Sequence, residues 1–230
     1  MSADLAFALE LADTADAISL PRFGSSDLRV ERKPDLTPVT DADRTIEEAL
    51  RALVAERGDG FFGEEDGGDP EGVRWIVDPI DGTKNFVRGI PVWATLIAFA
   101  REDELVLGVV SAPALGRRWW AARSEGAYCN GRPIRVSAVS QLADAAVSVA
   151  LAADLAALED VAWHVRGFGD FWQHVLVAEG SLDAAIDYPL KLWDFAALVP
   201  IVEEAGGRTG FTANGQFVTS NGALHDHVVT

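Results

Sequence analysis

The segment WIVDPIDGTKNF, residues 75–86, places two aspartates directly behind an apolar run. The run at 75–77 predicts a buried strand, and Asp78 is its expected last residue because a residue before proline favours extended backbone. Asp81 follows after Pro79 and Ile80. Charged carboxylates beside a buried strand are costly to desolvate. Whatever the two aspartates bind therefore constrains the fold and the function of the chain.

Chain size and charge narrow the classes of fold and partner. With 230 residues and 49% hydrophobic content, the chain can bury a large core in one domain or in two closely packed halves. The net charge of −17 argues against nucleic acid or an anionic membrane as partner. An anionic substrate would need metal ions or local basic groups to reverse this field.

The cysteine content and the amino-terminal segment indicate the cellular compartment in which the protein is expected. The single Cys129 excludes an internal disulfide and fits a reducing cytoplasm. Residues 1–18 predict a helix rather than a signal peptide, and no segment is long and apolar enough to span a bilayer. We therefore expect a cytoplasmic protein.

The two parts of the chain differ in their predicted elements. Residues 1–140 predict a helix over 3–22, a second helix capped by Thr40 or Asp41, and an antiparallel meander within 92–123. The remainder alternates, with strands expected at 147–151, 181–188, 207–211 and 216–220, and helices at 154–162, 169–180 and 193–207. Without a linker between them, 1–140 and 141–230 are expected to be two halves of one domain.

The segment at residues 75–86 combines features of a cation site and a phosphate site. Carboxylates such as Asp78 and Asp81, at a strand end beside a helix start, suit Mg²⁺. The exposed backbone N–H groups of Gly82 and Thr83 would bind a phosphate oxygen. The alternative is a surface turn in which Asp81 caps a helix and Asp78 is solvated.

Two further acidic positions favour the cation site. Glu64 and Glu65 follow an apolar run, and Asp194 stands behind Trp193 at a predicted helix start. Taken one at a time, Glu64 and Glu65 can be explained as ordinary surface acids, and Asp194 as the cap of a helix. Because three such apolar-to-acidic boundaries rarely coincide by chance, together they predict one metal site.

These motifs resemble those of the inositol monophosphatase superfamily of Mg²⁺-dependent, Li⁺-sensitive phosphatases. The resemblance covers nearly the whole chain, and its motifs, in matching order and separation, are GEE at 63–65, WIVDPIDGTKNF at 75–86 and WDFAALVPIVEEAGG at 193–207. It implies an α/β (α+β) fold, a layered αβαβα sandwich with a larger antiparallel sheet, a smaller mixed sheet and the active site between them. It also implies a homodimer.

The resemblance also implies the metal ligands and their chemistry. Glu64, Asp78, Asp81, Asp194 and the backbone carbonyl of Ile80 would hold two or three Mg²⁺ ions, and Li⁺ would inhibit. The ions would neutralise phosphate charge, acidify a bound water and stabilise the leaving oxygen.

The attacking water is expected to be activated by Asp43 and Thr83, with Glu64 helping to orient it. Taken alone, Asp43 reads as an ordinary acid in the first turn of a helix. In-line attack would release phosphate without a phosphoenzyme. In agreement, the sequence has no nucleophilic Ser/His/Asp or Cys/His arrangement, and its four histidines lack metal-ligand spacing.

The metal motifs do not identify the phosphate ester. Longer stretches at 33–44 and 81–98 are similar to the bacterial histidinol-phosphatase branch. We therefore expect hydrolysis of histidinol phosphate, a small-molecule substrate. The alternatives are an inositol-1-monophosphatase or another sugar or nucleotide phosphatase and, in a different class, a non-catalytic metal-binding regulatory protein.

Candidate specificity residues follow from the charge of histidinol phosphate. Its ammonium and its protonatable imidazole would favour carboxylates beyond the metal ligands, for which Asp170, Glu179 and Asp187 are candidates. Asp187 stands where the resembling inositol phosphatases use a Glu to bind a substrate hydroxyl. Asn85 is expected to bond substrate near the phosphate, and Arg166 to orient Asp170 or contact the ester. The alternatives are a structural Arg166–Asp170 ion pair and an ordinary helix-end acid at Glu179.

Overall fold

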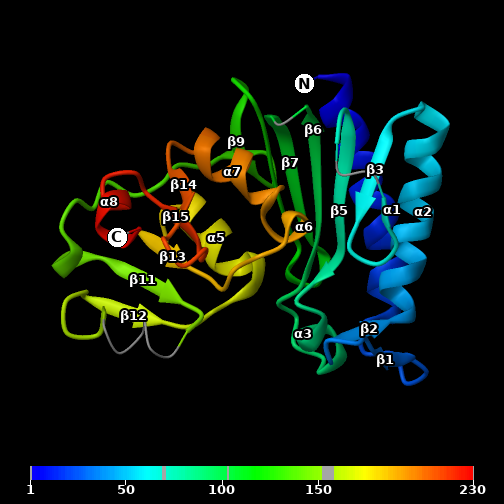
Figure 1. Ribbon diagram of the computed structural model, residues 1–230, viewed down its shortest axis with the longest axis horizontal. Helices are drawn as coiled ribbons and strands as arrows, with labels where there is room; N and C mark the ends of the chain where they lie inside the picture. The colour runs from blue at the N-terminus through cyan, green and yellow to red at the C-terminus, as the bar shows by residue number, and fades with distance from the viewer. Residues whose placement is uncertain (1, 69–70, 103, 152–157, 230) are drawn as a thin grey trace.

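The computed structural model describes residues 2–68, 71–102, 104–151 and 158–229. Helices and sheets of these residues are layered in the order helix, sheet, helix, sheet, helix (Figure 1). This arrangement confirms the predicted αβαβα sandwich. Every helix in the described residues is too short or too polar to cross a membrane.

Two long helices, α1 (Ala3–Arg22) and α2 (Asp41–Arg57), pair with each other and cover the outer face of the larger sheet (Figure 1). Apolar side chains at helical spacing bury one face of each helix. As predicted, Thr40 caps α2: its hydroxyl accepts from the Asp43 N–H, and the Asp43 carboxylate accepts from the Thr40 N–H. A short hairpin, β1 (Val30–Arg32) and β2 (Pro38–Thr40), connects the two helices.

The larger sheet has eight strands in the order β10-β9-β8-β7-β6-β5-β3-β4. Its strands are β3 (Gly60–Gly63), β4 (Gly67–Gly68), β5 (Arg74–Asp81), β6 (Ala94–Arg101), β7 (Glu104–Ala112), β8 (Arg117–Ala122), β9 (Gly126–Cys129) and β10 (Arg132–Pro133). The predicted meander is confirmed as β6–β8. The sheet is not wholly antiparallel, because the chain turns back through β4 and then enters β5 parallel to β3.

Strand β5 runs past its predicted end at Asp78 and finishes at Asp81. It accommodates Pro79, which has no backbone N–H, through a shift of its register with β6 between Asp78 and Asp81. The hydroxyl of Thr95 on β6 donates to the Pro79 carbonyl at 2.7 Å. The expected short helix α3 (Thr83–Val87) follows at once.

The middle layer contains α5 (Asp170–Ala178), α6 (Leu192–Phe195) and α7 (Leu198–Glu204). Helices α6 and α7 pack on the larger sheet, and α5 packs between α7 and the smaller sheet (Figure 1). The prediction of one helix over 193–207 is wrong. The helix breaks after Phe195 because the ring of Pro200 conflicts with the carbonyl four residues earlier, at Ala196.

The smaller sheet has five strands in the order β12-β11-β13-β15-β14, and its pairs are partly parallel and partly antiparallel, as predicted. Helix α8 (His225–Val228) packs against it. Residues 154–157 of the predicted helix at 154–162 lie outside the described residues. The strands are β11 (Ala146–Val149), β12 (His164–Arg166), β13 (Ala184–Ile186), β14 (Arg208–Phe211) and β15 (Phe217–Ser220), and single 3₁₀ turns occupy Pro113–Leu115 and Leu142–Asp144.

Candidate metal centre

The irregular end of β5 brings the carboxylates of Asp78 and Asp81 together. In a regular strand, side chains three positions apart point to opposite faces of the sheet. The register shift at Pro79 re-aims one of them, as β-bulges do. Ligand atoms of Asp78, Asp81 and Asp194 all lie within 4.8 Å of one another. The two halves of the chain thus contribute to one acidic cluster.

The electrostatics of this cluster fit a bound cation. Burial and the charges of Glu64 and Asp81 raise the pKa of Asp78 well above its ordinary value. Burial and the Asp170 charge do the same to the pKa of Asp81, and burial raises the pKa of Asp194 to about 6. Within the described residues, the buried Asp78 Oδ1 has no hydrogen-bond partner. An all-oxygen set with such an orphaned acceptor suits a hard divalent ion such as Mg²⁺.

Backbone donors fix two of the carboxylates and leave their second oxygens available. Asp81 Oδ2 accepts from the Phe171 N–H at 2.6 Å. Asp194 Oδ2 accepts from the Lys191 N–H at 2.7 Å, in the capping arrangement of α6. Because these bonds set the side-chain orientations in advance, a cation would find the site largely pre-formed.

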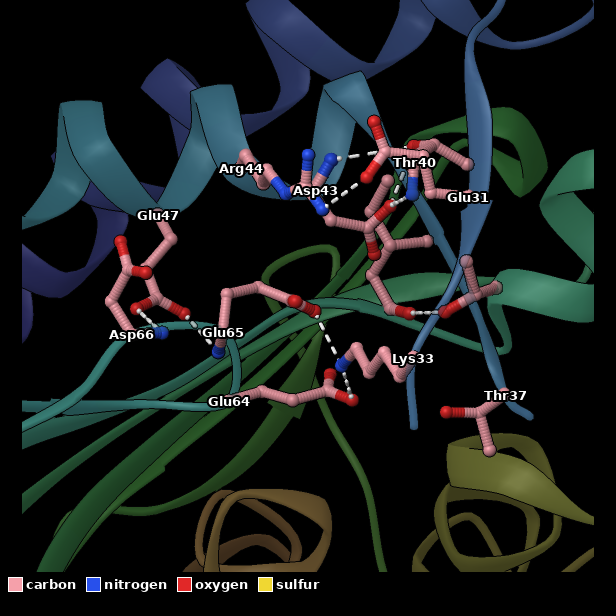
Figure 2. A network of polar contacts seen from close by, with 12 residues as sticks. Glu31, Lys33, Thr37, Thr40, Asp43, Arg44, Glu47, Glu64, Glu65 and Asp66 are labelled. Atoms are coloured by element: carbon pink, nitrogen blue, oxygen red, sulfur yellow. Dashed lines mark hydrogen bonds and ion pairs between the residues drawn. The ribbon is translucent and has the colours of Figure 1, made fainter. Parts of the chain in front are cut away.

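Glu64, at the end of β3, is paired with a lysine from the β1–β2 hairpin (Figure 2). Lys33 Nζ lies 2.7 Å from Glu64 Oε1 and 2.7 Å from Glu65 Oε1. Although burial disfavours its charge, hydrogen bonds to these carboxylates raise the pKa of Lys33. The hairpin is therefore held against the acidic turn by this pair of contacts.

Glu47 on α2 supports the same turn and was not predicted from the sequence. Its fully buried carboxylate accepts from the N–H groups of Glu65 at 2.8 Å and Asp66 at 2.9 Å (Figure 2). Arg51 lies 2.6 Å from it and provides a counter-charge. A Cβ at Gly63 would overlap this carboxylate, so the glycine of GEE is needed for close approach. A glutamate on the apolar face of a helix was the available signal.

The predicted water-activating residues, Asp43 and Thr83, lie on connected elements. The Thr83 hydroxyl donates to the Ile80 carbonyl at 3.0 Å. Burial raises the pKa of Asp43 to about 7, and among the described residues its Oδ1 lacks a hydrogen-bond partner. Helix α3, which starts at Thr83, contacts β2, whose last residue Thr40 caps α2. Thr83 is thus held by the Ile80 carbonyl, and Asp43 by Thr40.

A cavity of about 490 Å³ opens at the metal ligands, and its lining comes from both halves of the chain. Three lysines, Lys33, Lys84 and Lys191, place positive charge there and favour an anionic group. Lys84 and Lys191 were not predicted. The described lining residues are Lys33, Asp35, Thr37, Pro38, Glu64, Asp78, Ile80, Asp81, Gly82, Thr83, Lys84, Asp170, Lys191, Trp193 and Asp194.

Only some of the predicted substrate residues reach this cavity. Gly82, Thr83 and Asp170 line it. Asn85 donates to Asp170 Oδ2 at 3.2 Å and to the Val92 carbonyl at 2.8 Å, so it supports Asp170. The surroundings of the Asp170 carboxyl group desolvate it and, with the charge of Asp187, raise its pKa.

Arg166 and Glu179 lie elsewhere. Arg166 ends β12 and donates to the carbonyl of its neighbour Val165, outside the described lining of the cavity. Glu179 pairs with Arg117 and accepts from Trp119 Nε1 at 2.7 Å, beside a separate cavity. The structure does not support either residue as a substrate contact. For Glu179 the reason is that α5 carries Asp170 at its first residue and Glu179 beyond its far end.

Asp187 is buried behind the cavity, with only 3% of its surface exposed. Its Oδ2 accepts from Gln173 Nε2 at 2.6 Å and lies 3.3 Å from His174 Nε2, and its Oδ1 accepts from the Tyr188 N–H at 2.7 Å. Both oxygens are thus engaged by the protein, and Asp187 is outside the described lining of the cavity, so the structure gives no support for the expected substrate contact. Asp187 acts instead as a buried negative charge that influences Asp170.

Comparison with known proteins identifies the family. A sequence model described as the inositol monophosphatase family matches residues 1–227. The chain belongs to this family. It is 49% identical over 251 residues to the histidinol-phosphatase of Mycobacterium tuberculosis, covering 99% of this chain and 96% of that protein.

Solved structures of inositol monophosphatase proteins share the fold. The IMPase of Thermotoga maritima matches with a TM-score of 0.90 at 31% identity, covering 99% of this chain and 96% of that one. An IMPase/NADP phosphatase complexed with Mg²⁺ and phosphate matches with a TM-score of 0.86 at 26% identity, covering 98% and 93%. These matches confirm the family resemblance and the fold class that the sequence motifs indicated.

Proposed function

We propose that the protein is a Mg²⁺-dependent phosphomonoester hydrolase that converts L-histidinol phosphate and water to L-histidinol and phosphate. The observation that carries the proposal is the oxygen cluster of Asp78, Asp81 and Asp194, of which Asp78 is buried, at a cavity whose lining also includes three lysines. The 49% identity to a histidinol-phosphatase supports the choice of substrate.

The proposed metal ligands are the carboxylates of Glu64, Asp78, Asp81 and Asp194 and the carbonyl of Ile80. We propose two or three ions for each site, with inhibition by Li⁺. When bound, Mg²⁺ supplies Lewis-acid chemistry, because it neutralises phosphate charge and makes water more acidic. The Phe171 and Lys191 N–H groups hold two of these carboxylates in place for the ions.

The attacking water is proposed to donate its proton toward Thr83 and Asp43. The Thr83 hydroxyl proton is committed to the Ile80 carbonyl, so its oxygen remains free to accept a proton of the water in a hydrogen bond. Asp43 Oδ1 is the proposed proton acceptor, since its pKa of about 7 suits a general base near neutral pH.

Phosphate binding is proposed to use the backbone N–H groups of Gly82 and Thr83 and the lysines of the cavity. Gly82 adopts φ of 81°, and a Cβ there would crowd the Val92 carbonyl and the Asp170 carboxylate. Glycine keeps this turn open to the substrate. Lys84 and Lys191 line the same cavity and offset the charge of the acidic cluster.

The leaving alcohol is proposed to face Asp170. This carboxylate lines the cavity outside the three-carboxylate cluster, and Asn85 holds its Oδ2. A cationic alcohol such as histidinol would gain an ion pair there that a neutral alcohol lacks. The second candidate, an inositol phosphate phosphatase, is favoured by the structural similarity to the Thermotoga maritima IMPase, but its neutral alcohol would form no ion pair with Asp170.

Phosphate release tests the proposal against a non-catalytic, metal-binding role. Purified protein is assayed on histidinol phosphate with Mg²⁺, after chelation by EDTA, and after Mg²⁺ is restored. We expect release that is lost on chelation and recovered on restoration. Metal binding without phosphate release would support the regulatory alternative, and release that is unaffected by chelation would contradict the metal assignment.

We further propose that residues 1–140 and 141–230 function as one phosphatase domain, and that the protein acts in the cytoplasm as a homodimer. The single cysteine supports the compartment. Sedimentation of the purified protein tests the dimer. A sedimenting mass equal to that of one chain would contradict it.

A further inference from the structure

A buried polar network lies behind the cavity, between α5 and the smaller sheet. Gln173 stands at its centre: Nε2 donates to Asp187 Oδ2 at 2.6 Å, and Oε1 accepts from the Ser148 hydroxyl at 2.7 Å. His174 continues it, 3.3 Å from Asp187 Oδ2 and 2.9 Å from the Thr219 hydroxyl. The exposure of these five residues is 3% or less. Since each member has a polar partner, the network forms a rigid unit.

The network ends at the backbone segment that carries Asp170. The Ser148 hydroxyl accepts from the Phe168 N–H at 3.1 Å, and Gln173 Oε1 accepts from the Gly169 N–H at 3.4 Å. Asp170 itself has φ of 50°, a left-handed conformation that non-glycine residues rarely adopt. Such strain persists only where the surroundings impose it. Ser148 and Gln173 hold the two residues directly before the strained position.

The other side of this segment is tied to the metal centre. Phe171 donates its N–H to Asp81, and Asn85 donates to the Asp170 carboxylate. Asp170 is thus fixed between the acidic cluster and the buried network. A shift of the segment would move the Asp170 carboxylate, which faces the proposed position of the leaving alcohol.

We propose that Ser148 and Gln173 are positioning residues that make the site selective for phosphate esters of cationic alcohols. Both side chains are fully buried and lie outside the described cavity lining, so they act through Asp170. This inference rests on the proposed function, in which histidinol is the cationic alcohol. It assigns part of the substrate selectivity to the interior of the smaller half.

Ser148→Ala removes the hydroxyl that holds Phe168, and Ser220→Ala is its matched control. Ser220 is also fully buried on the smaller sheet, but its hydroxyl lies 2.9 Å from His225 Nδ1. kcat and KM are measured on histidinol phosphate and on glycerol 2-phosphate, whose alcohol is neutral. We expect Ser148→Ala to raise KM for histidinol phosphate about fivefold, with kcat within about twofold of the parent and with KM for glycerol 2-phosphate unchanged.

Two further variants test whether the change in substrate preference acts through Asp170. Gln173→Met, of similar volume, removes the bonds to Ser148, Gly169 and Asp187, and should lower the preference for histidinol phosphate further. Asp170→Asn should lower that preference as well, because it removes the charge that the two network residues position. Ser220→Ala should behave as the parent on both esters. Equal KM increases on the two esters, or parent-like KM in both network variants, would overturn the inference.

Hydrogen exchange keeps this test separate from the proposed function. If the parent protein shows no preference for histidinol phosphate, the proposed function has failed. Amide exchange of a peptide that contains Phe168 and Gly169 then tests the positioning role without substrate. It should be faster in Ser148→Ala than in the parent, and unchanged in Ser220→Ala. Equal exchange in all three proteins would contradict the inference.

Discussion

The backbone N–H of Phe171 donates a 2.6 Å hydrogen bond to Asp81 Oδ2, across 90 positions of the chain. The bond joins the first residues of α5 to the end of β5, and so joins the two halves at the acidic cluster. Asp194, from the second half, completes that cluster. The acidic cluster therefore forms only when the halves are docked, and the segment that carries Asp170 is fixed to one of its carboxylates.

Asp81→Asn should abolish Mg²⁺-dependent phosphate release, lowering kcat by about three orders of magnitude or more while the protein stays folded. The Asn side-chain oxygen can still accept from Phe171, so the junction between the halves survives, but the charge that binds the cation is lost. Turnover and circular dichroism of the variant test this. Near-normal activity would refute the metal assignment.

Thr83→Ala should lower kcat more than it changes KM, because the hydroxyl is assigned to the attacking water rather than to the substrate. Thr83→Ser keeps the hydroxyl that donates to the Ile80 carbonyl and should recover most of the rate. Steady-state kinetics of the pair measure this. A loss that falls mainly on KM would show that Thr83 binds substrate.

Glu47→Gln should weaken Mg²⁺ binding about tenfold and lower the melting temperature, since the buried carboxylate holds the N–H groups of the turn after Glu64. The control is Glu48→Gln, at the next position on α2. It also removes one negative charge, but from a side chain that is exposed to solvent. Calorimetric titration with Mg²⁺ distinguishes the two. Equal affinity in both variants would mean that Glu47 does not shape the site.

The metal-free protein should lose stability as pH rises. The pKa values of Asp43, about 7, and Asp194, about 6, exceed the ordinary 3.8, so folding favours their protonated forms. This stabilising contribution is complete below pH 3.8 and is lost as pH rises through the two folded-state values. Mg²⁺ requires deprotonated carboxylates and should raise the melting temperature more at about pH 8 than at about pH 5.5.

Thermal melts in EDTA and in Mg²⁺ across that range check the sign of the effect. Asp194→Asn should flatten the pH dependence in EDTA, because the variant has no carboxyl group to titrate at that position. If the melting temperature of the metal-free parent rises between about pH 5.5 and about pH 8, the assignment of these raised pKa values is contradicted.

The sequence allowed much of the acidic cluster to be predicted, because its residues stand in short motifs at element ends. Asp78, Asp81 and Asp194 were found in this way, and Thr40 was recognised as a helix cap. What brings the first two together was not predicted. A strand ending at Asp78 was expected, whereas the structure has a register shift at Pro79, which depends on pairing with β6.

Features that depend on distant contacts could not be predicted from local patterns. Glu47 is an ordinary helical glutamate until the turn after Glu64 folds onto it. Asp187 and Glu179 were expected to meet substrate, but the partners that engage them lie on other elements. The break near Ala196 was, in contrast, readable from Pro200, which disfavours a continuous helix.

The most direct test of the central claim is kcat/KM on histidinol phosphate, inositol 1-phosphate, fructose 1,6-bisphosphate and 3′-phosphoadenosine 5′-phosphate, all with Mg²⁺. The carboxylate of Asp170 at the cavity predicts that histidinol phosphate exceeds each of the others by at least about tenfold. An inositol phosphate that exceeds histidinol phosphate by about the same factor would contradict the proposed substrate.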